Sequence, residues 1–312
     1  MEINVIIPTY NEEGNIQTLY KSLTDNLSTI KYTLTFVDDG SNDSTLDILT
    51  SIYNKDKKHI KVISFSRNFG KDQAIYAGMS TNHSKYVSII DADMQQNPKY
   101  IMDMYKYLEE NKDYDEVAMV NVYDKDSLIQ KQAKKTFYSI MKNMTKQNYE
   151  AGASDFRLLK KEVVDSILKL QETNRFTKGI FSWVGFKIHY IKYTPEKRLS
   201  GTSKFKFKKQ FSYALDAILN FSTIPLRISS IIGGTISLVS FIYFIVLLIK
   251  TLIMGKDIPG YASLMCILLL LGGLILFVLG IIGEYVSRTY IEIKKRPIYI
   301  AKTTLGFDED IL

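Results

Sequence analysis

An α/β domain with a mainly parallel central sheet, followed by two membrane-spanning helices, is the fold that the sequence predicts. In residues 1–195, short runs rich in β-branched side chains alternate with helical stretches, which is typical of a sheet covered by helices. Nearer the C-terminus, two long runs contain no charged residue, as membrane-spanning helices require. The two parts of the chain are therefore expected to have different surroundings.

Five strands are expected in the first part of the chain. Their apolar character is continuous rather than alternating, which indicates strands covered on both faces in a mainly parallel sheet. Ligands of such sheets gather at the carboxyl ends of the strands. The expected strands are Ile3–Ile7, Thr33–Val37, Lys61–Phe65, Tyr86–Ile90 and a fifth near Glu116–Val122.

The two apolar runs, Ile228–Ile249 and Ile258–Gly283, are each long enough to cross a bilayer. At about 1.5 Å per residue they reach roughly 33 and 39 Å, against a hydrocarbon core of about 30 Å. The alternative is a hydrophobic hairpin in the core of a soluble protein. Basic residues precede the first run and follow the second, so a multi-pass protein of the cell membrane with both termini in the cytoplasm is expected.

Composition divides the chain into five segments. Residues 196–227 mix lysines with apolar side chains, as a helix at a membrane surface does. The expected segments are a cytoplasmic α/β domain (1–195), a basic amphipathic juxtamembrane segment (196–227), two spans (228–249 and 258–283) and a cytoplasmic C-terminal tail (284–312).

The charge and cysteine content exclude several classes of protein. The net charge of +7 is consistent with phosphates, nucleic acid or a membrane surface as partners and does not choose among them. The single cysteine, Cys266, excludes an internal disulfide, and three histidines leave little for a histidine metal cluster. A reducing compartment fits best. An acid at Glu2 and the early Pro8 argue against a secretory signal peptide.

Polar clusters follow three of the expected strands, at the edge of the sheet where a ligand would bind. They are Pro8–Glu12, Asp38–Ser41 and Asp91–Asp93. Carboxylates two residues apart at a strand end can point the same way, and such oxygen ligands suit Mg²⁺ or Mn²⁺ that also binds a diphosphate. The alternative for this Asp-x-Asp is a solvated turn.

The pair Asp38 and Asp39 indicates nucleotide binding, because a carboxylate at a strand end accepts hydrogen bonds from a pyrimidine N–H or from ribose hydroxyls. The alternative is an ordinary turn with a helix cap from Ser41, Asp43 or Ser44. The chain has no Gly-x-Gly-x-x-Gly after its first strand and no P-loop, so neither a dinucleotide-binding fold nor a P-loop NTPase is supported.

Several motifs together resemble a known family. Val5–Glu13, Val37–Ser41, Asp91–Gln95 and the paired apolar runs look like a family 2 inverting glycosyltransferase of GT-A fold. Four further motifs look like the polyprenyl-phosphate glycosyltransferases, the group of bactoprenol glucosyltransferase and dolichol-phosphate mannose synthase. These are Ser66–Lys71, Ser154–Leu159, Arg198 with Ser203–Phe205, and Glu284–Val286 with Arg288. The resemblance covers almost the whole chain, and it implies that residues 1–195 are a GT-A catalytic domain.

The resemblance implies a role for each matching residue. The residues expected to bind a UDP-sugar are Pro8, Tyr10, Asn11, Glu12, Asp38, Asp39, Lys71, Asp91, Gln95 and Trp183. Asp91 and Asp93 would hold Mg²⁺ or Mn²⁺, and the catalytic set would be Asp93, Asp155 and Arg157. For Asp155 the alternative is a salt bridge with Arg157 on a strand. For Trp183 the alternative to stacking near the sugar is a place in the core.

The acceptor side is expected among basic residues. Residues 197–209 contain six basic side chains and no acid, just before the first span, where the headgroup of a polyprenyl phosphate would lie. By the resemblance, Arg198, Ser203 and Lys204 bind its phosphate; the alternative is an anchor to anionic lipid. Further candidates, Lys131, Lys134 and Lys135, stand where relatives tend to carry arginines, and lysine lacks the bidentate fork.

The resemblance implies inverting transfer of a sugar, glucose or N-acetylglucosamine, from its UDP donor to undecaprenyl or another polyprenyl phosphate. The expected partners are the donor, the lipid acceptor, the bilayer, further copies of the chain and a flippase of the same pathway, and nucleic acid is not expected. A polysaccharide synthase acting on a sugar hydroxyl would need a base and usually a Gln-x-x-Arg-Trp motif, which the chain lacks. A non-catalytic membrane-tethered nucleotide-binding protein is the other alternative.

Overall fold

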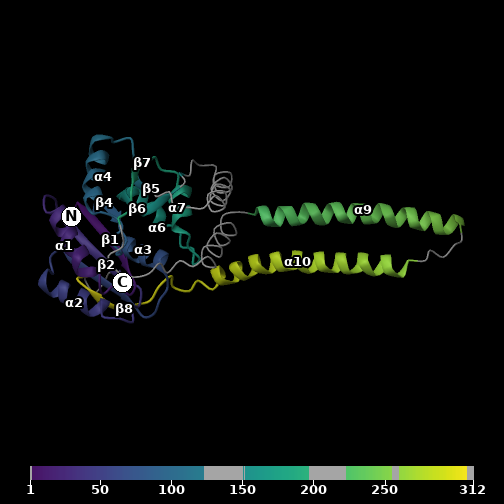
Figure 1. Ribbon diagram of the computed structural model, residues 1–312, viewed down its shortest axis with the longest axis horizontal. Coiled ribbons are helices and arrows are strands. Elements are labelled where there is room, and N and C mark those ends of the chain that lie inside the picture. Colours follow the sequence, from purple (N-terminus) through teal and green to yellow (C-terminus); the bar gives the residue numbers. More distant parts are fainter. Residues whose placement is uncertain (1, 123–149, 151, 197–222, 255–259, 308–312) are drawn as a thin grey trace. The chain divides into compact units, whose positions relative to one another are not determined.

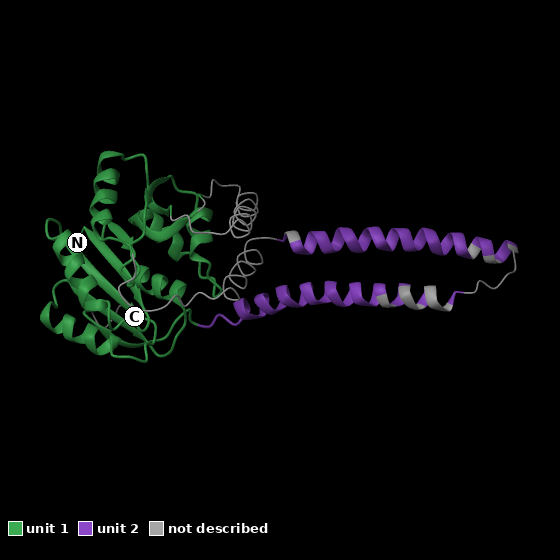
Figure 2. Cartoon of the chain, viewed as in Figure 1, with its two compact units in different colours: residues 1–217, 297–312 green, residues 218–296 purple. Residues whose placement is uncertain are grey.

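The chain forms two compact units. The computed structural model describes residues 2–122, 150, 152–196, 223–254 and 260–307. Residues 1–217 and 297–312 make up one unit, and residues 218–296 make up the other (Figure 2). The C-terminal residues therefore belong to the same unit as the N-terminal domain, although the second unit lies between them in the sequence.

A single sheet organises the first unit (Figure 1). Its described strands number eight, in the order β7-β5-β6-β4-β1-β2-β3-β8. They are β1 (Ile3–Thr9), β2 (Tyr32–Asp38), β3 (Ile60–Phe65), β4 (Tyr86–Ile89), β5 (Glu116–Asn121), β6 (Ala153–Lys160), β7 (Ile188–Tyr193) and β8 (Ala301–Leu305). Strand β1 pairs in parallel with β2 and β4, and the β2–β3 and β5–β7 pairs are also parallel. The predicted α/β fold with a mostly parallel sheet is confirmed, with antiparallel pairs at β6 and β8.

Helices cover both faces of this sheet. They are α1 (Ile16–Leu27), α2 (Thr45–Lys55), α3 (Lys71–Ser80), α4 (Lys99–Glu110), α6 (Lys161–Leu168) and α7 (Thr177–Trp183). Alternate residues of β1, such as Val5 and Ile7, share a core with buried side chains of α1, α2 and α4. Ile6 points to the opposite face, where it lies against Gly78 of α3. Because both faces are covered, nearly every residue of β1 and β2 is buried, including Thr33 and Thr35, which alternate with apolar residues in β2.

The register of β6 determines what lies near the end of β4. The two strands are antiparallel, with Ile89 opposite Arg157. Two residues further on, β6 presents Asp155 at the place where Asp91 follows β4. The antiparallel strand thus brings a carboxylate from the second half of the domain to the edge where the parallel strands end.

The C-terminal segment adds a strand to the sheet. Ala301–Leu305, which the sequence analysis places in a cytoplasmic tail, form β8 and pair antiparallel with β3. Leu305 packs against the core, and the alternating exposure along β8 is that of an edge strand. The tail therefore completes one edge of the domain.

The second unit contains two long helices, α9 (Ile224–Met254) and α10 (Tyr261–Ile293), which contain most of the predicted apolar runs and lie side by side (Figure 1). The stretches Pro225–Leu247 and Leu270–Ile293 have mean hydropathies of 2.2 and 2.0 and are long and apolar enough to cross a membrane. Large apolar side chains on both helices, including Phe241 at 60% and Phe277 at 66% exposure, are open to the surroundings. This exposure favours association with a membrane over a buried hairpin in a soluble core.

The contact between α3 and β1 gives a test of the packing. A Cβ atom on Gly78 would lie 2.5 Å from Ile6 Cγ2, and Ile6 is fully buried. We expect Gly78→Val to lower the free energy of unfolding by about 1–3 kcal/mol through overpacking. Thermal unfolding of the purified protein measures this.

Ile6→Ala makes room at the same contact and serves as the control. The double variant Ile6→Ala/Gly78→Val should lose less stability than the sum of the two single changes, because the residues touch. Strict additivity would contradict the contact.

Candidate active site

The loops after β1 and β2 are bonded to each other. Asn11 adopts a positive φ of 53°, its backbone N–H donates to Ser41 Oγ at 2.9 Å, and its Oδ1 accepts the backbone N–H of Asn42 at 2.9 Å. The backbone N–H of Glu12 donates to Thr45 Oγ1 at 2.9 Å. The predicted donor residues Pro8, Tyr10, Asn11 and Glu12 therefore lie in one corner fixed by hydrogen bonds between the two loops.

Asp38 and Asp39 are both buried, with 1% and 4% of their surface exposed. The carboxylate of Asp38 accepts from the backbone N–H of Ser41 at 3.1 Å and from Ser64 Oγ at 2.7 Å. Asp39 Oδ1 accepts from the backbone N–H of Phe69 at 2.6 Å, and Oδ2 accepts from that of Gly70 at 2.9 Å. Burial raises the pKa of Asp39, and these two N–H groups oppose that shift. In this structure the pair fixes loops, which is a more specific role than the ordinary turn given as the alternative to nucleotide binding.

The loop of residues 66–70, between β3 and α3, crosses close to the loop after β2. Gly40 has a φ of 67°, and a Cβ atom there would lie 2.5 Å from the backbone carbon of Arg67. Only a glycine permits both this conformation and this approach. The crossing and the bonds from Asp39 together fix the residue that follows the loop, Lys71.

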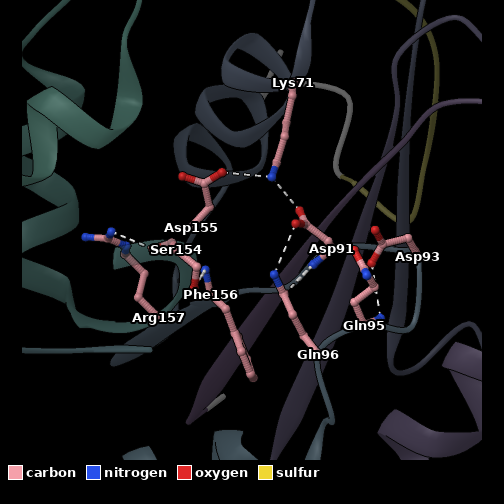
Figure 3. A network of polar contacts seen from close by, with 9 residues as sticks. All are labelled: Lys71, Asp91, Asp93, Gln95, Gln96, Ser154, Asp155, Phe156 and Arg157. Carbon is pink, nitrogen blue, oxygen red and sulfur yellow. Dashed lines mark hydrogen bonds and ion pairs between the residues drawn. The ribbon is translucent and has the colours of Figure 1, made fainter. Parts of the chain in front are cut away.

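Lys71 lies between two carboxylates at the first turn of α3 (Figure 3). Its Nζ is 2.5 Å from Asp91 Oδ1 and 2.8 Å from Asp155 Oδ2. Desolvation lowers the pKa of Lys71, but the two carboxylates raise it by more, so the ammonium stays charged. Burial raises the pKa of Asp155, yet Lys71 and Lys178 hold it well below its usual range. Asp155 thus pairs with Lys71 rather than with Arg157, the partner in the sequence-based alternative.

A buried glutamine, Gln96, holds Asp91. Gln96 Oε1 accepts the backbone N–H of Asp91 at 2.9 Å, and its Nε2 donates to Asp91 Oδ2 at 3.1 Å. The neighbouring Asp93 accepts the backbone N–H of Gln95 at 3.1 Å (Figure 3). The Asp-x-Asp is therefore an ordered loop at the end of β4. Gln96 is not among the residues predicted from the sequence, which include only its neighbour Gln95.

The contacts of Arg157 are not those expected of the catalytic residue that the sequence predicts. Its guanidinium is ion-paired with Glu116, and the exposed fractions of the two side chains are 3% and 0%. It also donates to the carbonyl of Ser154 at 2.7 Å and lies 3.7 Å from the ring centroid of Phe181. In Figure 3 a dashed line joins its guanidinium to Ser154. These contacts are those of a structural ion pair between β5 and β6.

Two further charged residues lie near Asp155 and were missed by the sequence analysis. Lys178 of α7 lowers the pKa of Asp155, and the charge of Asp155 in turn affects Asp72 of α3. Burial, followed by the charge of Asp155, raises the pKa of Asp72 to about 6. Their sequence surroundings give no signal, because α3 and α7 are brought together only by the fold.

Trp183 is the last residue of α7, and its side chain is 56% exposed. It therefore does not lie in the core, which was the alternative to stacking near the sugar.

The predicted acceptor residues lie outside the described residues. They are Lys131, Lys134, Lys135, Arg198, Ser203 and Lys204. The geometry above therefore concerns the donor side of the expected site.

Comparison with known proteins identifies the family. The Glycosyl transferase family 2 profile matches residues 4–168, and that of the GtrB C-terminal hairpin matches residues 224–289. The chain belongs to glycosyltransferase family 2. The resemblance found in the sequence is thus confirmed, the enzyme is a glycosyltransferase, and its eight-stranded unit is a GT-A-like domain.

Relatives match along nearly the whole length of this glycosyltransferase. An uncharacterized glycosyltransferase of Synechocystis sp. is 38% identical over 311 residues, which cover 99% of this chain and 97% of that protein. The putative glycosyltransferase CsbB of Bacillus subtilis is 38% identical and covers 96% of this chain and 91% of its own. The prophage bactoprenol glucosyl transferase homolog of Escherichia coli is 35% identical over 97% of this chain and 99% of its own.

The buried ion pair gives a test of the role of Arg157. Glu116→Gln leaves a buried guanidinium without its counter-charge, and we expect it to lower the free energy of unfolding by about 3–5 kcal/mol. The double variant Glu116→Leu/Arg157→Met removes both charges and should regain most of that stability. Urea unfolding measures both. A stable double variant that has lost all transferase activity would contradict a purely structural role for Arg157.

Asp72 gives a test that depends on pH. Its pKa of about 6 in the folded protein lies above the ordinary value of about 3.9 for the unfolded chain. Between these values the folded state binds more protons, so the contribution of Asp72 to stability falls as the pH rises through this window and stays low above it. We expect the melting temperature of Asp72→Asn, relative to wild type, to increase from pH 4 to pH 7.

The matched control is Asp47→Asn, which changes an exposed acid in the first turn of α2. Melting is followed in buffer without divalent metal. A difference between Asp72→Asn and wild type that stays constant with pH would contradict the raised pKa.

Proposed function

We propose that this glycosyltransferase moves a sugar, glucose or N-acetylglucosamine, from UDP to undecaprenyl phosphate or another polyprenyl phosphate. The observation that carries the proposal is the Lys71, Asp91 and Asp155 cluster at the strand ends of a chain that also has two exposed apolar helices. The name of the Escherichia coli relative, a bactoprenol glucosyl transferase homolog, supports this acceptor. The products would be a polyprenyl-phosphate sugar and UDP.

The donor's nucleoside is assigned to the corner formed by Pro8, Tyr10, Asn11 and Glu12 together with Asp38 and Asp39. A carboxylate has about four acceptor sites. Asp38 and Asp39 can therefore accept from a base N–H or a ribose hydroxyl while they keep their bonds to the loops. Gln95 and Trp183 complete the assigned set, and the exposed indole suits stacking on a sugar face.

Asp91 and Asp93 are the residues that would hold a divalent cation, Mg²⁺ or Mn²⁺. The donor set fits, because both are carboxylates in one loop and Asp91 already faces a cationic group, the ammonium of Lys71. Among the described residues no group of three or more histidine, cysteine, aspartate or glutamate side chains forms a metal site, so diphosphate oxygens and water would complete the ligands. When bound, the cation neutralises charge on the diphosphate.

The reaction needs little proton transfer. A phosphate monoester is largely ionised near neutral pH, so its oxygen attacks the anomeric carbon directly. The new bond forms on the face opposite UDP, the bond to the UDP oxygen breaks, and the configuration inverts. The protein therefore contributes mainly orientation and charge neutralisation.

Asp155 is assigned to orient the sugar and acceptor rather than to remove a proton. Its pKa is held low, so it is ionised and a poor base. Its Oδ2 binds Lys71, while Oδ1 is buried and has no hydrogen-bond partner among the described residues. A sugar hydroxyl is the donor that this oxygen lacks. Lys71 adds positive charge where two anionic substrates meet.

The acceptor phosphate is assigned to Arg198, Ser203, Lys204, Lys131 and Lys135. Basic residues at both ends of the hairpin support a cytoplasmic catalytic domain and cytoplasmic termini. Association of further copies through α9 and α10, and a flippase that moves the product across the membrane, belong to the same proposal.

Transfer to lipid is tested with the purified full-length protein in nanodiscs. Label from a radioactive UDP-sugar should enter the organic phase only when polyprenyl phosphate is present. A panel of UDP-sugars in the same assay identifies the donor. Label that enters a water-soluble glycan without the lipid would favour the sugar-hydroxyl alternative, and binding without transfer would favour the non-catalytic one.

Asp93→Ala tests the metal assignment. We expect it to reduce the rate of metal-dependent transfer at least about 100-fold, because removal of one group that stabilises transition-state charge lowers the rate of other enzymes by about this much. Asp103→Ala, which removes an exposed acid of α4, is the matched control and should retain activity. Full activity of Asp93→Ala with EDTA present would reject the metal role.

A further inference from the structure

The segment that follows the hairpin borders the loop that leads to Lys71. In the antiparallel pair of β3 and β8, Phe65 lies opposite Ala301, at the end of β3 nearest the site. The ladder continues past the strand, because the backbone N–H of Ser66 donates to the carbonyl of Ile300 at 3.0 Å. The C-terminal segment is therefore bonded to the first residue of the 66–70 loop.

Tyr299 contacts residues at the end of β3 and the end of α3. Its ring stacks on that of Phe65, with centroids 5.0 Å apart and planes 22° apart. Its hydroxyl lies 3.3 Å from Oγ of Ser80, the last residue of α3. Phe65 in turn meets Phe69 edge to face at 5.7 Å. Tyr299 thus connects the end of β3, the far end of α3 and, through Phe65, the loop itself.

The 66–70 loop is held from its other side by Asp39. The carboxylate of Asp39 accepts the backbone N–H groups of Phe69 and Gly70, and the next residue is Lys71. The loop is therefore fixed between a buried carboxylate and a stack of aromatic rings. Both supports therefore lie next to the residue whose ammonium binds Asp91 and Asp155.

We propose that Tyr299 is a positioning residue for donor binding. It acts through Phe65 and Phe69 and keeps Lys71 in place for the diphosphate of the donor. The inference rests on the proposed UDP-sugar donor. Because α10 ends at Ile293, only a short linker separates this residue from the membrane hairpin, so the part of the chain that follows the hairpin also supports the donor site.

The test uses full-length protein in detergent and UDP, the part that all the proposed donors share. Calorimetric titration gives the Kd of UDP, and steady-state transfer gives KM for the donor and kcat. We expect Tyr299→Ala to raise Kd and KM about threefold to tenfold, as loss of an aromatic contact does, with a smaller effect on kcat. Tyr299→Phe keeps the ring and should restore binding close to wild type.

Phe307→Ala is the matched control. It removes an aromatic ring from the same segment, but Phe307 follows the end of β8 remote from the loop, where its ring lies 4.8 Å from Lys61 Nζ. UDP binding should be unchanged in this variant. If Tyr299→Ala does not fold, Tyr299→Leu keeps apolar bulk without the stack and is used in its place, with the same expected loss.

The outcomes separate this inference from the proposed function. Wild-type protein that does not bind UDP would overturn the proposed donor and this inference with it. Wild type that binds UDP while Tyr299→Ala binds it equally well would overturn the inference alone. An equal loss in Phe307→Ala would also overturn it, since the effect would then come from the whole segment rather than from Tyr299.

Discussion

The site depends on the ammonium of Lys71 lying between the carboxylates of Asp91 and Asp155. These residues come from the start of α3, the loop after β4 and the antiparallel strand β6. Two carboxylates so placed would repel each other. The ammonium binds both, so one charge interaction couples the positions of three separate segments of the chain.

The supporting residues keep this cluster in one geometry. Gln96 binds both the backbone and the side chain of Asp91, while the buried Asp39 holds the loop before Lys71. Arg157, on the strand that also carries Asp155, is ion-paired with Glu116 of β5. Each of these groups binds the protein itself, which limits the reorganisation needed when a charged ligand arrives.

The sequence predicts the parts of this architecture that depend on local pattern. Strands β1 to β5 are visible as apolar runs, and Asp91 and Asp93 are recognisable because they follow such a run.

The pairing of Lys71 with Asp155 was not predictable, since it depends on the register of β6 against β4. The partner of Arg157 was also missed, because Glu116 begins a strand in another part of the chain and nothing local marks it as buried. Asp38 and Asp39 were placed correctly at a strand end, but their bonds to the loops follow from the loop crossing at Gly40.

The position of β8 has a consequence for biosynthesis. A ribosome makes this strand only after both apolar helices, so β3 lacks its edge partner until more than 200 residues have followed it, an intervening stretch that includes α9 and α10. Pairing across so long an intervening stretch is slow compared with local folding. The edge of the sheet at β3 is therefore completed last, and a nascent chain interrupted before this strand has an open sheet edge.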